Sequence, residues 1–414
     1  MTATTTPGAT SGADHGTSQG TSHGPVLAGL VTAVVGFSSS FVVVLAGLTA
    51  MGATPAQAAS GLLTLCVVQA LAMAWLSLRH RMPISIAWST PGAALLATSA
   101  GAAGGWPVAV GAFTVTGALI LATALLPRLG DLVAAIPTTL ARAMLAGVLL
   151  PLCVAPATAL VEEPWVVGPV VATWLVLLRV ARRWAVPGAL LVALSAVVLT
   201  ADVAPHSWWP QLVWTTPHWT VAGAIGVALP LYVVTMASQN VPGVAVMASL
   251  GYRVPWRESL AVTGLGTIAG AGTGGHAVNL GAITAALAAG PDAGPDRSRR
   301  WIATVTASGA YLVLAVASAA LAALVAAAPG GVMQAAAGLA LLGTLATSLS
   351  DALGDPTDRE AAAATLVVAA SGITVLGIGA AFWALLTGLA VRAVLRGWVR
   401  RTAAPAGRVP ESPV

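Results

Sequence analysis

Two long uncharged stretches of this 414-residue chain are each interrupted by polar side chains. The interruption at residues 83–94 places Trp88 among hydroxyl and β-branched residues, and the interruption at residues 272–283 contains His276 and Asn279. Hydroxyl and amide groups can hydrogen-bond a small ligand, an indole can stack on a flat ring, and an imidazole can exchange a proton near neutral pH. These residue types predict a site that binds a small molecule reversibly.

Two further polar groups lie in apolar surroundings and are expected at the same site. Ser238, Gln239 and Asn240 are consecutive, and they could line a cavity or join neighbouring helices by hydrogen bonds. Near the N-terminus three successive serines cannot share one helix face, so one of them, taken as Ser39, is expected to reach the site. The expected ligand-binding residues are Ser39, Ile86, Ala87, Trp88, Ser89, Thr90, Gly92, Ser238, Gln239, Asn240, Gly275, His276 and Asn279.

For three of these residues, Trp88, His276 and Asn279, a structural role is the alternative to a role in binding or coupling. Trp88 could pack against helices or lipid, because buried aromatic residues are common. His276 could carry a coupled proton, because an ionisable group within a membrane segment indicates function. It could equally stay neutral and hold the backbone by hydrogen bonds. Asn279 could face a cavity or cap a helix that begins near Leu280.

Both interruptions have the sequence of a broken helix. Residues 84–90 alternate between apolar and polar, which predicts an extended stretch, and Pro91 suits the first turn of a helix with Ser89 or Thr90 as its cap. A pair of glycines at residues 274–275 disfavours helix in the second interruption. Two half-helices would then point their N-termini at each other near the bilayer midplane. Such ends carry partial positive charge and free N–H groups, which suit a small anion such as a carboxylate.

The composition identifies a multi-span membrane protein. Hydrophobic residues make up 57% of the chain and charged residues 7%, whereas soluble proteins carry about 25% charged residues. Uncharged runs such as residues 15–78 can hold two helices, since one span needs about 20 residues. The pI of about 10.2 comes from 18 arginines in short loops rather than from one basic stripe. The expected surroundings are therefore a lipid bilayer and not nucleic acid.

The fold class predicted is an all-α polytopic membrane protein with fourteen spans, and twelve spans is the alternative. The predicted segments cover residues 25–46, 56–78, 84–101, 106–126, 132–157, 164–180, 185–201, 219–240, 256–270, 276–290, 301–326, 331–350, 361–378 and 380–398. With the N-terminus in the cytoplasm, every arginine except Arg142 falls on the inner side, as the positive-inside rule requires.

Fourteen spans divide into two repeats of seven, the second inverted relative to the first. The first repeat is expected over residues 25–203 and the second over residues 219–398, with broken segments 3 and 10 in matching positions. Inverted repeats with central broken helices are typical of transporters. Residues 1–24 are expected to form a disordered cytoplasmic tail, and residues 399–414 a second cytoplasmic tail.

Arg142 could attract an anionic substrate, but it is more simply expected to pair with a carboxylate or a backbone carbonyl inside the bundle. No Asp or Glu lies clearly within a predicted span, so a carboxylate proton relay is not expected. The sequence shows no metal-ligand cluster, catalytic dyad or phosphate-binding loop. The protein is therefore not expected to be an enzyme or to hold a cofactor or a metal.

At the interrupted segments the chain resembles the benzoate/proton symporter family, the benzoate membrane transport proteins. The stretches that carry the resemblance are residues 47–62, residues 81–94 with Trp-Ser-Thr-Pro-Gly, residues 239–243, and residues 274–280 with Gly-Gly-His-Ala-Val-Asn. This family is related in fold to nucleobase permeases and to sulfate-type anion transporters.

The resemblance implies two domains that move against each other. A core domain would comprise residues 25–126 plus 219–326, and a gate domain would comprise residues 127–218 plus 327–398. It also implies an elevator-like movement of the core, often within a homodimer.

The resemblance also narrows the substrate. In the nucleobase branch, acidic residues in two spans help bind the base, whereas Ser238 and Val278 stand at those positions here. A monoanionic aromatic acid is therefore expected in place of a nucleobase. The predicted function is a secondary transporter of the inner membrane that imports benzoate or a similar aromatic carboxylate with a proton. The alternatives are a nucleobase or another organic anion carried on the same fold, and an anion channel or uniporter.

Overall fold

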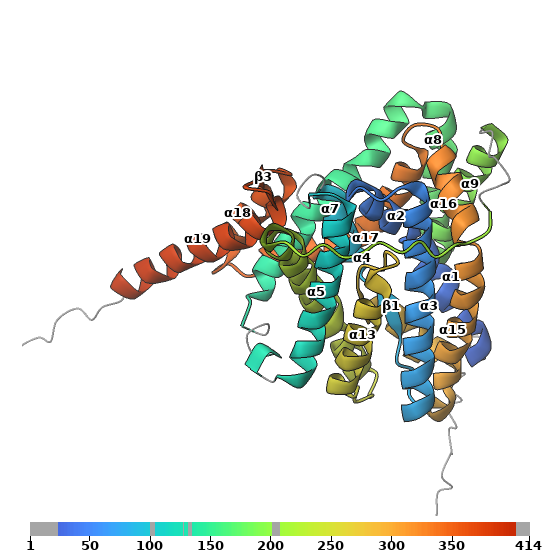
Figure 1. Cartoon of the computed structure of the whole chain (residues 1–414), viewed down its shortest axis with the longest axis horizontal. Coiled ribbons are helices and arrows are strands. Elements are labelled where there is room, and N and C mark those ends of the chain that lie inside the picture. The colour runs from blue at the N-terminus through green and yellow to red at the C-terminus, as the bar shows by residue number, and fades with distance from the viewer. Residues whose placement is uncertain (1–23, 100–103, 127, 131–134, 201–207, 403–414) are drawn as a thin grey trace, which may run out of the picture.

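Helices dominate the structure, and two small antiparallel sheets of two strands each accompany them (Figure 1). The computed structural model describes residues 24–99, 104–126, 128–130, 135–200 and 208–402. The predicted all-α polytopic fold with short extended stretches in two broken segments is confirmed. The predicted tail at residues 1–24 lies outside the described residues apart from Gly24. Of the predicted tail at residues 399–414, only residues 399–402 are described, as the end of a helix.

The first half of the chain consists mainly of long apolar helices. Proline in the first turn begins several of them, where its missing N–H costs no hydrogen bond. The elements are α1 (Pro25–Ser38), α2 (Phe41–Ala50), α3 (Pro55–His80), β1 (Ile86–Trp88), α4 (Thr90–Thr98), α5 (Trp106–Leu125), α7 (Thr138–Glu162), α8 (Pro164–Val180), the 3-10 turn η1 (Arg182–Trp184) and α9 (Ala185–Thr200).

The second half has more interruptions. Its elements up to the second half-helix are α10 (Val221–Gly223), η3 (Ala224–Ala228), α11 (Leu229–Thr235), η4 (Met236–Asn240), α12 (Val241–Ser249), α13 (Trp256–Ala271), β2 (Val278–Leu280) and α14 (Ala282–Ala289). They are followed by η5 (Pro291–Ala293), η6 (Arg297–Arg299), α15 (Trp301–Val316), α16 (Ser318–Ala327), α17 (Val332–Leu353), α18 (Arg359–Ala370), β3 (Thr374–Val375), β4 (Ile378–Gly379) and α19 (Ala380–Thr402).

One long helix carries the polar residues 238–240. It runs from Val221 to Ser249, so the predicted end of this segment at residue 240 is wrong. Two π-helical turns, η3 and η4, lie within it, and η4 directly precedes Pro242. A proline ring clashes with the carbonyl four residues earlier in a regular α-helix, and a π-turn changes that spacing. The helix can therefore continue through Pro242.

The number of membrane spans is not settled by helix length. Seven described helical stretches are long and apolar enough to cross a bilayer, and the pair α15 and α16, bent by 56°, would make an eighth. The half-helices α4 and α14 have 9 and 8 residues, which is too short for a hydrocarbon core of about 30 Å at about 1.5 Å per residue. Fourteen spans therefore stays a prediction.

Helix packing divides the bundle into two groups. The first helix group (α1–α5 and α10–α16) has its largest contacts between α5 and α13, α3 and α15, and α1 and α15. The second helix group (α7–α9 and α17–α19) has its largest contacts between α7 and α17 and between α7 and α18. The groups meet where α4 contacts α7 and where α2 contacts α17. In Figure 1, α19 extends away from the rest of the bundle.

The two interrupted segments meet in the sheet. Strand β1 pairs with β2 in antiparallel register, with Ile86 opposite Leu280, Ala87 opposite Asn279 and Trp88 opposite Val278. Each strand leads directly into a half-helix, β1 into α4 and β2 into α14. The pairing satisfies backbone groups that would otherwise be unpaired inside an apolar bundle. It therefore brings the N-termini of α4 and α14 together.

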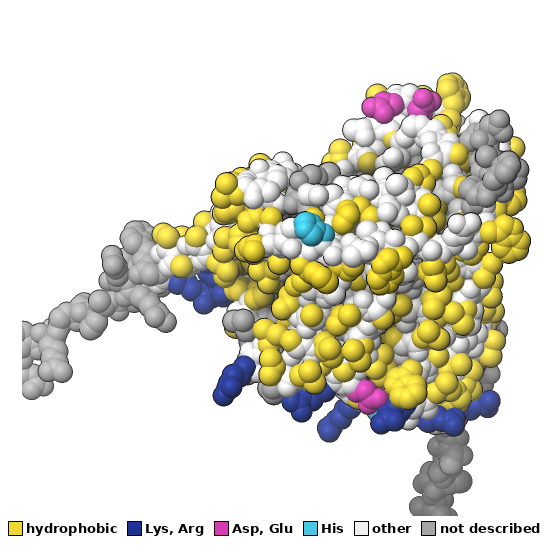
Figure 2. Space-filling view, viewed as in Figure 1, with side chains coloured by type: hydrophobic (Ala, Val, Ile, Leu, Met, Phe, Trp, Pro, Cys, Tyr) yellow, Lys and Arg dark blue, Asp and Glu magenta, His cyan; other side chains and the backbone are white. Residues whose placement is uncertain are grey.

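Basic side chains gather at one end of the bundle, and hydrophobic side chains cover its flank (Figure 2). Contacts at this end join arginines at the end of α3 to neighbouring helices. The Nε atom of Arg79 lies 2.8 Å from Oε1 of Glu258, and the guanidinium of Arg81 lies 4.6 Å from the ring centre of Trp301. We refer to this end, which contains the loops after α3, α12 and α14, as the arginine-rich end.

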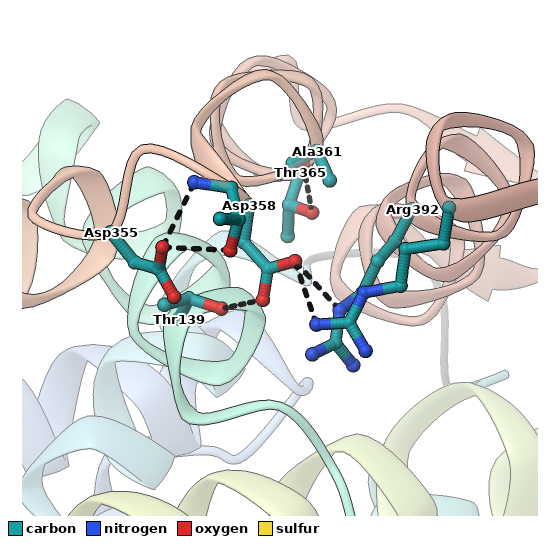
Figure 3. Close-up of polar contacts among 8 residues, drawn as sticks. Thr139, Asp355, Asp358, Ala361, Thr365 and Arg392 are labelled. Atoms are coloured by element: carbon teal, nitrogen blue, oxygen red, sulfur yellow. Dashed lines mark hydrogen bonds and ion pairs between the residues drawn. The ribbon is translucent and has the colours of Figure 1, made fainter. Parts of the chain in front are cut away.

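A buried carboxylate connects the last helices to α7. Asp358 is 3% exposed and lies just before α18. It accepts hydrogen bonds from the Thr139 hydroxyl at 3.2 Å and from Nε of Arg392 at 2.8 Å (Figure 3). In the same loop, hydrogen bonds from Thr357 lower the pKa of Asp355 below its ordinary value. The junction of α7, α18 and α19 is thus fixed by charge as well as by packing.

Candidate binding site

A cavity of about 280 Å³ lies between the two helix groups, beside the paired strands. Its walls come from α1, β1, α4, η4, α14 and α15 on one side, and from α7 and α17 on the other. Six of the residues predicted from the sequence line it: Ser39, Ala87, Trp88, Thr90, Ser238 and Gln239.

The two half-helix N-termini differ in their free hydrogen-bond donors. At α4, the Ser89 hydroxyl accepts a hydrogen bond from the Gly92 N–H at 3.1 Å, and Pro91 has no N–H. At α14, the N-cap is Gly281, which offers no side-chain acceptor. The first residues of α14, Ala282 and Ile283, line the cavity with their N–H groups uncapped. The end of α14 is therefore the better site for an anion.

Trp88 forms an aromatic wall of the cavity and is also packed. Its side chain is 3% exposed, and its Nε1–H donates to the Ser40 hydroxyl at 2.8 Å. Its ring makes edge contacts with Phe37, with centres 5.6 Å apart, and with Tyr311, with centres 6.1 Å apart. The structure is therefore consistent with both roles considered for Trp88, ligand contact and packing, because the ring lines the cavity and also belongs to an aromatic cluster.

The polar side chains of the π-turn η4 point in different directions. Ser238 and Gln239 line the cavity, and the Ser238 hydroxyl donates to the Val234 carbonyl. Asn240 is fully buried, and its Oδ1 accepts a hydrogen bond from the Leu280 N–H at 2.9 Å. One residue of the turn therefore holds β2 in place while its two neighbours face the cavity.

Seven predicted site residues do not line the cavity. Ser89 caps α4, and its N–H donates to the Ala277 carbonyl at 2.9 Å. Asn279 does not cap α14, because that helix begins two residues later than expected, and its amide donates to the Leu280 carbonyl at 2.9 Å. The whole set away from the cavity is Ile86, Ser89, Gly92, Asn240, Gly275, His276 and Asn279. Most of them hold the strands or pack against neighbouring backbone.

His276 lies behind the strands. It is fully buried, its Nδ1 accepts a hydrogen bond from the Ala277 N–H at 2.7 Å, and its ring centre lies 6.3 Å from that of Phe113. No hydrogen-bond partner of its Nε2 is found among the described residues. The Nδ1 contact requires an imidazole that is unprotonated at that nitrogen. This geometry agrees with the structural alternative for His276.

Sequence reasoning missed several cavity residues that come from distant helices. Tyr311 lies on α15, Thr344 and Thr347 lie on α17, and Thr284 lies in the first turn of α14. They line the cavity together with Arg142 and Asp351. One signal in the sequence was Arg142, the arginine that does not fit the inner loops, and another was the three- and four-residue spacing of Thr344, Thr347 and Asp351. Asp351 directly follows the uncharged run that ends at residue 350.

Arg142 and Asp351 face each other across the second helix group. The Nε atom of Arg142 lies 3.5 Å from Oδ2 of Asp351, and the two side chains are 24% and 54% exposed. The expected pairing of Arg142 with a carboxylate is therefore seen. Among the described residues, no group of three or more His, Cys, Asp or Glu is arranged to hold a metal ion.

A second cavity of about 730 Å³ lies on the other side of a thin barrier. Along α7, the first cavity reaches Leu149 and the second begins at Pro151. Along α17, the boundary falls between Ala337 and Ala340. Less than one helical turn of each helix therefore separates the two cavities.

Replacing Asn240 tests whether it supports the strands. Asn240→Leu keeps the number and branching of the side-chain heavy atoms but leaves the buried Leu280 N–H without its acceptor. An unsatisfied buried donor costs about 1–3 kcal/mol, so we expect a clearly lower melting temperature in detergent. Ser249→Ala, an exposed change on the same long helix, should leave the melting temperature unchanged. Equal melting temperatures for Asn240→Leu and the unmodified protein would contradict this role.

Two broken helices that meet beside a cavity between two helix groups define a class, the multi-pass membrane transporters. The chain matches the benzoate membrane transport protein family over residues 19–394. It therefore belongs to that family, whose members are transporters and not enzymes.

Individual relatives agree with this assignment. The chain is 38% identical over 366 residues to the inner membrane protein YdcO of Escherichia coli, covering 87% of this chain and 93% of YdcO. It is 26% identical over 373 residues to the benzoate membrane transport protein of Acinetobacter baylyi, covering 88% and 93%. The transmembrane domain of a cyanobacterial bicarbonate transporter, BicA, has the same fold, with a TM-score of 0.56, 14% identity, and coverage of 90% of this chain and 97% of that one.

Proposed function

We propose that the protein imports benzoate or a similar aromatic carboxylate together with a proton. The observation that carries the proposal is the uncapped N-terminus of α14, which lines the same cavity as Trp88. A carboxylate at this end would meet free N–H groups and the positive end of the helix dipole. The benzoate transport protein of Acinetobacter baylyi supports the choice of substrate by its name.

The cavity suits an aromatic ring attached to that carboxylate. Trp88 and Tyr311 supply ring surface, and Ser238, Gln239 and Thr90 supply hydroxyl and amide groups. No acidic side chain reaches the cavity from η4, since that turn contributes Ser238 and Gln239. An acid at this place would repel an anion. The lining therefore favours an aromatic acid over a nucleobase.

We propose an elevator-like movement of the first helix group against the second. The two groups would act as the core domain (residues 25–126 plus 219–326) and the gate domain (residues 127–218 plus 327–398). The substrate elements β1, α4, β2 and α14 all belong to the first group, and the two cavities lie along the interface between the groups. Sliding the half-helices past the barrier would transfer the site from one cavity to the other.

The orientation follows from the arginines. The first cavity extends toward the start of α7 and the end of α17, where Arg142 and Asp351 lie. The neighbouring loops are the ones that the positive-inside rule assigns to the cytoplasm. We propose that the protein lies in the inner membrane with both termini in the cytoplasm, that the cavity here opens inward, and that a homodimer is its working form.

His276 remains a candidate for the proton carrier. It is the single ionisable residue of the second interrupted stretch, and it lies next to β2. Proton transfer to it would require water to reach a side chain that is fully buried here. A change of conformation would have to supply that access.

Substrate preference can be measured by isothermal titration of the purified protein. We expect benzoate to bind, and benzamide, which has the same shape without the charge, to bind at least about tenfold more weakly, a loss of about 1.4 kcal/mol. Uracil and bicarbonate should not displace benzoate. Tighter binding of uracil would assign a nucleobase, and binding of bicarbonate alone would assign an inorganic anion.

A further inference from the structure

One ion pair lines the cavity, and its two members are the only charged residues that do so among the described residues. Arg142 comes from the first turns of α7 and Asp351 from the last turn of α17. Both lie in the second helix group, opposite the half-helices. The pair is therefore a part of the cavity that the half-helix site does not explain.

The ion pair with Asp351 leaves most N–H donors of the Arg142 guanidinium able to bind another group. The contact joins Nε of Arg142 to Oδ2 of Asp351 at 3.5 Å, longer than a close charge-assisted hydrogen bond of about 2.7–2.9 Å. A guanidinium has five N–H donors in a planar fork that fits a carboxylate. Within the described residues, Arg142 makes no other ion pair. A carboxylate that enters the cavity can therefore compete with Asp351 for this guanidinium.

Other charges around Asp351 are few. The helix α17 packs against α2, α7, α8, α9 and α18. Of these, α2 and α9 carry no ionisable residue, and the ionisable residue that the first helix group adds to the cavity lining is Tyr311. The ionisable residues on the remaining helices are Arg142, Cys153 and Glu162 on α7, Arg179 in the last turn of α8, and Arg359 and Glu360 at the start of α18.

We propose that Arg142 and Asp351 form the site that couples binding of the substrate anion to uptake of one proton. The incoming carboxylate binds between the N–H groups of α14 and the guanidinium of Arg142, where it replaces Asp351, and Asp351 accepts one proton that enters from bulk solvent through the cavity. Two carboxylates beside one guanidinium repel each other when both are charged, and this repulsion favours protonation of one of them. The added charges, one negative and one positive, cancel, and the cavity takes up substrate and proton in a one-to-one ratio. This inference rests on the proposed function, because it assumes a carboxylate substrate.

The test is the pH dependence of benzoate binding to the full-length protein in detergent. Binding that takes up one proton weakens by up to about tenfold for each unit of rising pH. We expect this slope in the unmodified protein and its loss in Asp351→Asn, which cannot accept the proton. Arg142→Gln should weaken binding by at least about tenfold at every pH, because the cation that receives the carboxylate is gone.

Two matched controls remove similar charges nearby. Asp355→Asn changes a carboxylate in the loop after α17, and Arg179→Gln changes an exposed arginine on α8. Neither residue lines the cavity, so both variants should keep the affinity and the slope of the unmodified protein. Melting temperatures show whether each variant is folded.

The possible outcomes distinguish failure of the proposed Arg142–Asp351 site from failure of the proposed substrate. An unchanged pH dependence of benzoate binding in Asp351→Asn, or unchanged affinity in Arg142→Gln, would overturn the proposal that this pair couples substrate binding to proton uptake. Loss of the slope in His276→Gln with a normal slope in Asp351→Asn would assign the proton to His276 instead. Failure of the unmodified protein to bind benzoate would overturn the proposed substrate itself.

Discussion

Gly281→Asp is expected to reduce uptake of an aromatic carboxylate at least about 100-fold, a loss of about 2.7 kcal/mol or more, while the protein stays folded. The new carboxylate would stand at the N-cap of α14 and occupy the N–H groups proposed for the substrate. Its charge would also repel the incoming anion. Aspartate is a favoured N-cap residue, and this capping should offset the cost of moving the Thr284 side chain away from the new Cβ. Uptake into proteoliposomes and the melting temperature measure the two effects separately.

Gly281→Asn is the matched variant, because asparagine has nearly the same shape and no charge. A Cβ at this position contacts the Thr284 hydroxyl, so both variants must displace that side chain to the same extent. We therefore expect Gly281→Asn to retain more uptake than Gly281→Asp. Equal loss in the two variants would mean that space at α14, and not charge, limits transport. Normal uptake by Gly281→Asp would exclude the end of α14 as the anion site.

Trp88→Ala is expected to lower both stability and affinity. Truncating a buried aromatic residue costs about 3–5 kcal/mol, and the Ser40 hydroxyl loses its donor. Binding of benzoate should weaken more than binding of an aliphatic acid such as butyrate, because the lost wall is aromatic. Calorimetry with both acids and thermal melting provide the comparison.

Trp88→Phe keeps an aromatic ring, so it tests the role of the ring even if Trp88→Ala does not fold. It should retain more preference for benzoate over butyrate than Trp88→Ala does. Trp75→Ala is the control on the outside of the bundle, since this side chain is 57% exposed and does not line the cavity. An unchanged ratio of benzoate to butyrate affinity in Trp88→Ala would place Trp88 in the packing alone.

The interrupted segments could be found from the sequence because their signals are local. Alternating residues before Pro91 predicted β1, the Ser89 cap predicted the start of α4, and the paired glycines predicted a break before β2. These features depend on backbone preferences within a few residues. The long-range step, the pairing of β1 with β2, was not predicted, because it joins residues that lie far apart in the sequence.

The direction of each polar side chain could not be predicted in the same way. Within η4, the π-turn determines that Gln239 faces the cavity while Asn240 faces β2, and no sequence pattern marked that turn. His276 and Asn279 were expected at the site because they are polar residues in an apolar stretch. Such residues are equally needed to satisfy the backbone of a broken helix.

The opposite wall of the cavity was the least predictable part. Thr344, Thr347 and Asp351 recur at three- and four-residue spacing, which places them on one face of α17. This spacing predicts a polar face, but it does not predict that the face meets Tyr311 and the half-helices, because those contacts join distant parts of the chain. Asp351 lies in the last turn of α17, so it belongs to the wall although it stands at the edge of an uncharged run.

Uptake of labelled benzoate into proteoliposomes, with and without an inward proton gradient, tests the central claim most directly. We expect accumulation above the outside concentration only when the gradient is present, and competition by aromatic acids but not by uracil. Equilibration without accumulation would contradict proton coupling and indicate a channel or uniporter. No benzoate entry under either condition would contradict the substrate.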